Sequence, residues 1–231
     1  MDEGLPDISI LVPTRKRPDN LVRLYSSVIT RAKYPKKIEF IVYVDEDDDS
    51  YEHINLPRLN IIRGPRILLA EAWNECWRHS VGDWLGLFGD DVIFTTDQWD
   101  ERFREATSRY PDNIGFFYGD DLSNRGKAYG THGFIHKTWA EAVGYFVPPY
   151  FSADYVDTWL NDVAALISRG VPIDIVTEHL HVGFGKAPND DTYMEARRRS
   201  LNDKTKELYE SKSKREEREQ HAEILKRLMN E

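Results

Sequence analysis

The chain has 231 residues, 40% of them hydrophobic and 31% charged, with a formal net charge of -9 at pH 7. This length suffices for one well-cored domain, and the acidic balance argues against a broad basic surface for nucleic acid, although a local basic groove is compatible with it. No stretch approaches the roughly 18 consecutive apolar residues of a membrane span, and the N-terminus lacks the pattern of a signal peptide. Cys76 is the only cysteine, which excludes an intrachain disulfide and a cysteine-based zinc cluster. We therefore expect a cytoplasmic protein.

The first half of the chain alternates between strand and helix patterns. Residues 8–12 form a short, β-branched apolar run that predicts a buried strand, and an amphipathic pattern from Pro18 to Ile29 predicts a helix. Further strands are predicted at 37–44, 59–62, 84–88 and 114–118, and further helices at 68–79 and 97–109. Such alternation is typical of an α/β fold with a mainly parallel central sheet flanked by helices.

The second half is less regular. Aromatic loops at 130–136 and 145–151 precede a helix predicted over 154–169 and a strand over 173–176. From about Tyr193 the sequence predicts a long, highly charged C-terminal helix with few apolar points. We therefore expect a domain at residues 1–192 and a helical extension at 193–231, which packs on the domain or forms a homodimer contact.

An acid pair, Asp90 and Asp91, ends the predicted strand at 84–88. Adjacent carboxylates repel each other and are costly to desolvate. A hard divalent cation, Mg²⁺ or Mn²⁺, would relieve both effects, because such ions bind carboxylate and phosphate oxygens. The alternative is an ordinary acidic turn.

Polar residues also follow the other predicted strands. Thr14 and Arg15 follow the first strand, Asp45 ends the second, and Arg63 follows the third. Ligands of open α/β sheets bind at the carboxyl ends of the strands. The pattern therefore predicts one binding site along one edge of the sheet.

Four motifs occur in a characteristic order. They are Val12-Pro13-Thr14-Arg15, the strand ending at Asp45, the helix bearing Ala70-Glu71-Ala72-Trp73-Asn74, and Gly89-Asp90-Asp91. This ordered set resembles the nucleotide-sugar half of a GT-A glycosyltransferase and is most similar to the family 2 enzymes. The resemblance spans residues 8–185.

The resemblance implies a GT-A, metal-dependent glycosyltransferase. Such an enzyme moves a sugar from a nucleoside-diphosphate sugar, a UDP-sugar by default, to an acceptor hydroxyl with inversion. The residues implied at the nucleoside are Pro13, Thr14, Arg15 and Asp45. Further contacts with the nucleotide sugar are implied for Arg63, Arg66, Asn74 and Asp90.

The resemblance also implies the metal ligands. Asp91 is the expected direct ligand of Mn²⁺ or Mg²⁺, although the fuller motif of the family has an acid where this chain has Gly89. Many GT-A enzymes supply a histidine from a loop after the last core strands, and His181 matches that position. A packed or surface histidine is the alternative.

An inverting transfer needs a carboxylate that accepts the proton of the acceptor hydroxyl. The family places this base at a helix start, about a dozen residues before a glycine. Asp157, thirteen residues before Gly170, is the first candidate and Asp154 the second. Helix capping is the alternative role of Asp154, and the family's usual Glu-Asp pair is absent because Ala153 precedes Asp154.

Two other classes of function remain open. A nucleotidyltransferase would carry a Gly-rich loop after the first strand, and residues 13–18 contain no glycine. A non-catalytic sugar-nucleotide or carbohydrate-binding module would have lost a metal ligand or the base, and Gly89 and Ala153 keep this class open. The sequence does not rank the acceptors, which include a protein, a glycan, a modified nucleobase in DNA and a metabolite.

Overall fold

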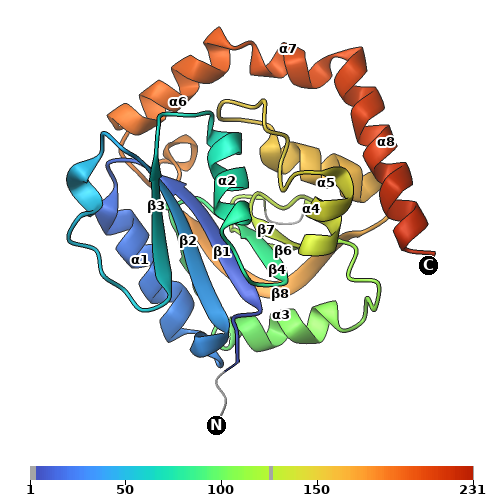
Figure 1. Cartoon of the computed structure of the whole chain (residues 1–231), viewed down its shortest axis with the longest axis horizontal. Helices are drawn as coiled ribbons and strands as arrows, with labels where there is room; N and C mark the ends of the chain where they lie inside the picture. The colour runs from blue at the N-terminus through green and yellow to red at the C-terminus, as the bar shows by residue number, and fades with distance from the viewer. Residues whose placement is uncertain (1–3, 125–126, 231) are drawn as a thin grey trace.

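A computed structural model describes residues 4–124 and 127–230. Within these residues, one sheet has the strand order β3-β2-β1-β4-β7-β6-β8-β5 (Figure 1). The strands are β1 (Ile8–Thr14), β2 (Ile38–Asp45), β3 (Leu59–Gly64), β4 (Trp84–Leu87), β5 (Val92–Phe94), β6 (Phe116–Asp120), β7 (Gly133–His136) and β8 (Gly170–His179). Strands β3, β2, β1 and β4 run parallel, as do β6 and β8, whereas β7 and β5 run antiparallel to their neighbours. The predicted α/β fold class is confirmed.

Helices cover both faces of this sheet (Figure 1). They are α1 (Pro18–Thr30), α2 (Leu69–Arg78), α3 (Trp99–Thr107), α4 (Lys137–Val143), α5 (Val156–Leu166), α6 (Asp191–Asn202), α7 (Thr205–Glu210) and α8 (Lys212–Leu228), with single 3-10 turns at Pro35–Lys37, Asp49–Tyr51 and Val182–Phe184. Helices α1 and α3 pack on one face, and α2, α4, α5 and α8 pack on the other.

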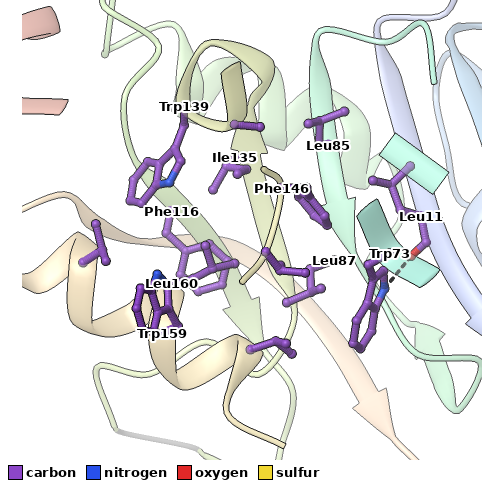
Figure 2. Packing of buried hydrophobic residues seen from close by; sticks show 14 of the residues in the cluster. Leu11, Trp73, Leu85, Leu87, Phe116, Ile135, Trp139, Phe146, Trp159 and Leu160 are labelled. Carbon is purple, nitrogen blue, oxygen red and sulfur yellow. Dashed lines mark hydrogen bonds between the residues drawn. The ribbon is translucent and has the colours of Figure 1, made fainter. Parts of the chain in front are cut away.

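The first strand shows why both faces must be covered. Successive side chains of a strand point to opposite faces, and Leu11 lies in one buried cluster while Ile10 and Val12 lie in the other. All seven residues of β1 are buried. Figure 2 shows the cluster on the α2 side, where Trp73 Nε1 donates to the carbonyl of Leu11 over 3.2 Å. This bond fixes α2 beside the carboxyl end of β1.

The structure departs from the predicted elements in its second half. Residues 133–136, which the sequence assigns to a loop, form β7, and residues 137–143, for which no element is predicted, form α4. The long C-terminal helix is divided into α6, α7 and α8, because Lys204 has a φ of 49° and Ser211 is extended, with its side chain capping α8. Short elements of this kind depend on tertiary partners more than on local pattern.

Helix α8 packs against the domain (Figure 1). Its residues Ala222 and Leu225 are buried in the same cluster as Trp159 of α5. Arg218 places its guanidinium 5.0 Å from the centre of the Trp159 ring and pairs with Asp162 at 3.2 Å. Among the described helices, none has the length and apolar character needed to cross a bilayer.

Candidate active site

The carboxyl ends of β1, β2 and β4 bring several of the predicted residues to one edge of the sheet. The Thr14 hydroxyl donates to Asp90 Oδ2 over 2.5 Å and lies 2.6 Å from the hydroxyl of Tyr51. Asp90 and Asp91 occupy the turn between β4 and β5 and are both buried. The first loop and the acid pair are therefore in direct contact.

A second group surrounds Asp45 at the end of β2. Its carboxylate is 4% exposed and accepts from Arg15 Nη1 at 2.8 Å and from Arg66 Nη1. Arg15 also donates two bonds to Asp47, of 2.5 and 2.9 Å. Three predicted residues therefore contact one another in one ionic group: Arg15, Asp45 and Arg66.

Three other predicted residues have structural contacts. Pro13 is buried within β1, opposite Tyr43 of β2. Arg63 donates to the carbonyl of Asp48 at 2.9 Å.

Asn74 is fully buried. Its amide donates to the carbonyls of Ala70 and Val147, and its oxygen accepts the N–H groups of Phe146 and Val147. These contacts use all the hydrogen-bonding positions of the Asn74 side chain.

The two acids of the pair differ electrostatically. Burial, reinforced by the charge of Asp91, raises the pKa of Asp90 to about 6. Burial acts in the same direction on Asp91, but its contact with His179 outweighs burial and holds the pKa of Asp91 well below its usual range. Asp91 therefore ionises at a lower pH than Asp90.

Asp91 lies in a cluster with His132 and His179. One potential ligand atom from each of these three residues lies within 4.8 Å of the other two. Burial and the neighbouring His179 lower the pKa of His132 to about 3, so its imidazole is neutral and can act as a ligand. Histidine nitrogens and a carboxylate oxygen are suitable donors for a divalent metal ion. This cluster fits a metal site.

The structure leaves no room for a side chain at position 89, where the fuller family motif has an acid and this chain has glycine. A Cβ at position 89 would lie 2.7 Å from Asp91 Oδ1 and 3.9 Å from His132 Nε2. A side chain there would have to displace the Asp91 carboxylate. The cluster thus contains His132 beside the position where the fuller family motif has a carboxylate.

His181 lies next to the cluster but outside it. Its ring is 5.1 Å from the ring of His179, and its Nδ1 accepts the N–H of Gly183 at 3.0 Å. From the sequence, the histidine ligand was predicted at His181 and no metal role was assigned to His132, which precedes β7 and is distant in sequence from the acid pair. The antiparallel pairing of β7 with β4 places it there.

The two candidate bases have different surroundings. The carboxylate of Asp157 accepts the N–H of Thr158 at 2.8 Å, and burial raises its pKa. Asp154 is exposed, accepts from the hydroxyl of Ser200, and its charge acts on His181. Asp154 is therefore the more exposed of the two candidates and the one whose charge acts on His181.

Helix α6 lies over this edge of the sheet. Tyr193 donates to Asp91, Glu195 pairs with Arg66 at 2.8 Å, and Ser200 donates to Asp154. Arg17 connects the helix to the first loop: it bonds Asp190 at 2.8 and 2.5 Å, lies 3.9 Å from the centre of the Tyr193 ring, and approaches Asp90 at 3.5 Å. Residues of α6 therefore cover the acid–histidine cluster.

Comparisons with known proteins agree with this geometry. The profile of the family described as Glycosyl transferase family 2 matches residues 9–205. Among solved structures, the chain is similar to the mannosyltransferase PcManGT from Pyrobaculum calidifontis in complex with GDP-Man and Mn²⁺, with 14% identity, a TM-score of 0.58, and coverage of 97% of this chain and 74% of that one.

It is also similar to S. aureus TarS 1–349, alone and in complex with UDP. The identities are 10% and 11%, and both TM-scores are 0.54. The alignment covers 74% of this chain and 57% of TarS, so the chain spans little more than half of that structure. No curated protein matches the chain. At these identities the solved structures support the fold alone.

Proposed function

Because this chain belongs to glycosyl transferase family 2 and is a glycosyltransferase, we propose that it transfers a sugar from a nucleoside-diphosphate sugar to an acceptor hydroxyl, with a divalent metal ion and with inversion. One observation carries this proposal. Asp45, a buried carboxylate flanked by arginines, and the acid–histidine cluster around Asp91 lie at the same edge of the sheet, and the exposed carboxylate of Asp154 interacts electrostatically with His181 next to that cluster. These are the groups required by the base, the diphosphate and the acceptor.

The group around Asp45 supports uridine as the nucleoside. Arg15 and Arg66 supply hydrogen-bond donors next to the Asp45 carboxylate, which is an acceptor. Uracil has the complementary edge, with one N–H between two carbonyl oxygens. Guanine would offer two adjacent N–H groups to the carboxylate and one oxygen to an arginine. We therefore propose UDP as the nucleotide and GDP as the comparison to test.

The metal site of the proposal is the cluster of Asp91, His132 and His179. A divalent cation bound there supplies Lewis-acid stabilisation of the departing diphosphate. The segment after β8 holds Asp91 in place, since the backbone N–H of Leu180 donates to the Asp91 carbonyl at 2.8 Å. The same bond fixes the segment that follows His179.

Asp154 is the proposed general base. The acceptor oxygen attacks the anomeric carbon, the bond from that carbon to the diphosphate oxygen breaks, and the proton of the acceptor hydroxyl passes to the Asp154 carboxylate. Ser200 of α6 donates to Asp154 and orients it. Asp157 is less suited, since its carboxylate is tied to the backbone of its own helix.

Nucleotide-dependent thermal stabilisation tests the proposal. UDP with Mn²⁺ at about 100-fold over its dissociation constant should add about 2.7 kcal/mol of stability, which is a rise of several degrees in Tm for a chain of this size. Asp45→Asn should lose the rise, whereas Asp49→Asn, a change at an exposed acid of the same loop, should keep it. Stabilisation by GDP and not UDP would correct the donor. If neither nucleotide stabilised the folded chain, the proposed function would be wrong.

A further inference from the structure

Three buried polar atoms lack a hydrogen-bond partner in the described part of the chain. They are Asp121 Oδ2, His132 Nδ1 and His179 Nδ1. A buried polar group without a partner is unusual and needs an explanation. All three belong to residues of the metal cluster or its immediate surroundings, since Asp121 Oδ2 lies 3.9 Å from His179 Nδ1.

The two nitrogens of His179 face two different carboxylates. Nε2 lies 3.4 Å from Asp91 Oδ2, and Nδ1 faces Asp121. Asp121 is itself held firmly, because its Oδ1 accepts the backbone N–H groups of Ser123 and Asn124, both at 2.9 Å. Its Oδ2 faces His179 Nδ1 at 3.9 Å, which is beyond hydrogen-bond distance, so the two side chains must approach slightly before Oδ2 accepts a proton from His179. A carboxylate behind a ligating histidine fixes its tautomer and raises its basicity.

We propose that Asp121 is a positioning residue that holds His179 with its proton on Nδ1 and its lone pair on Nε2 toward Asp91, in a two-histidine, one-carboxylate site selective for transition-metal ions over Mg²⁺. The inference rests on the metal site of the proposed function. It goes further in assigning the class of metal and the role of Asp121.

The types of ligand atom in the cluster determine which metal ion it prefers. Mg²⁺ prefers oxygen ligands in a near-octahedral arrangement, whereas imidazole nitrogens favour ions such as Zn²⁺, Co²⁺ and, more weakly, Mn²⁺. His132 lies against Phe88, with parallel rings 5.7 Å apart, and its ring meets that of His179 edge-on at 4.7 Å. This packing fixes the two imidazoles before any ion binds. Gly89 leaves the space between Asp91 and His132 free of a side chain.

Calorimetric titration of the full chain with Co²⁺, Mn²⁺ and Mg²⁺, without nucleotide, tests the selectivity. We expect the affinity to fall in the order Co²⁺, Mn²⁺, Mg²⁺. X-ray absorption of the Co²⁺-loaded wild type should show scattering from two imidazole ligands. Equal affinities for Co²⁺ and Mg²⁺, or a spectrum without imidazole, would overturn the inference, and this measurement needs no variant that could misfold.

Asp121→Asn tests the positioning role. The two backbone N–H groups would retain the amide oxygen, so the NH₂ group would face His179 Nδ1 and favour the tautomer with its proton on Nε2. That tautomer cannot bind a metal through Nε2. We expect the Co²⁺ affinity to fall by about tenfold or more. Asp174→Asn is the control, because it changes an exposed acid on β8, the strand that carries His179, and it should leave the affinity unchanged. An unchanged affinity in Asp121→Asn would refute the role.

Paired histidine variants decide between the cluster and the ligand implied by the family resemblance. His132→Gln should weaken Co²⁺ binding strongly, and His181→Gln should not. The reverse result would assign the site to His181 and overturn the inference. Thermal stabilisation by nucleotides is measured in parallel. A chain that prefers Co²⁺ over Mg²⁺ but binds no nucleotide would reject the proposed function and support this inference. A chain that binds a nucleotide but prefers Mg²⁺ would support the proposed function and reject this inference.

Discussion

The hydroxyl of Tyr193 donates to Oδ2 of Asp91 over 2.5 Å, so a residue in the first turn of α6 covers the acid expected to bind the metal. The same oxygen lies 3.4 Å from His179 Nε2. Tyr193 and a metal ion therefore meet at the same carboxylate.

Tyr193→Phe should strengthen metal binding. The phenol donates a hydrogen bond to a charged, buried acceptor, and an ion must compete with it. We expect the Co²⁺ affinity to rise by roughly threefold to tenfold, as measured by calorimetry. Tyr34→Phe, at an exposed tyrosine of another loop, is the control. A weaker affinity in Tyr193→Phe would mean that the hydroxyl supports the ion instead of competing with it.

The candidate bases can be separated by paired substitutions. Removing a general base should lower kcat by about 10²- to 10⁴-fold, and we expect this loss for Asp154→Asn. Asp157→Asn should stay within a few-fold of wild type, because its carboxylate bonds the N–H of Thr158. Steady-state sugar transfer at saturating donor gives both values. A severe loss in Asp157→Asn alone, with an unchanged Tm, would favour the first choice of the sequence analysis.

Asn74 is expected to stabilise the fold. Its side chain links α2 to the backbone at Phe146 and Val147, and Asn74→Ala would leave these buried groups without partners. Each such group costs about 1–3 kcal/mol, so the free energy of unfolding should fall by about 3 kcal/mol. Urea denaturation measures the change, with exposed Asn60→Ala as the control. A loss of nucleotide affinity at unchanged stability would instead support the contact implied by the family resemblance.

His221 should make the docking of α8 sensitive to acid. It is buried next to Tyr145, Glu217 and Trp159, and burial lowers its pKa. A histidine whose pKa is lower in the folded protein contributes stability that is fully present above the unfolded pKa and is lost as the pH falls. Stability should therefore decline below about pH 6.5.

Thermal unfolding between about pH 8 and pH 5 checks this effect. His221→Gln should show a flatter pH profile than wild type, and His53→Gln, at an exposed position, should retain the wild-type profile. An identical slope in His221→Gln would show that other groups set the acid sensitivity.

The strand ends could be predicted from the sequence because the signal is local. The apolar run before Thr14 and the strand ending at Asp45 fix both the parallel sheet and the edge at which polar groups gather. Asp121 could have been predicted in the same way, because Asp120 and Asp121 form an acid pair soon after the predicted strand at 114–118. It was not assigned to the site from the sequence.

Other parts of the site depend on long-range packing. His132 reaches Asp91 because the short strand β7 pairs antiparallel with β4, and no local pattern predicts that partner. Helix α6 has a highly charged sequence, and it covers the site through Tyr193 and Glu195. Both contacts join segments far apart in the chain.

Release of a nucleoside diphosphate from UDP- and GDP-sugars, with and without a divalent metal ion, tests the central claim most directly. We expect slow, metal-dependent release of UDP by the wild type in the absence of acceptor, and we expect chelation or Asp91→Asn to abolish this release. Release that persists unchanged in Asp91→Asn would contradict the assigned site. A folded protein that binds the nucleotide but releases none from any donor, with every metal tried, would contradict the proposed transferase mechanism.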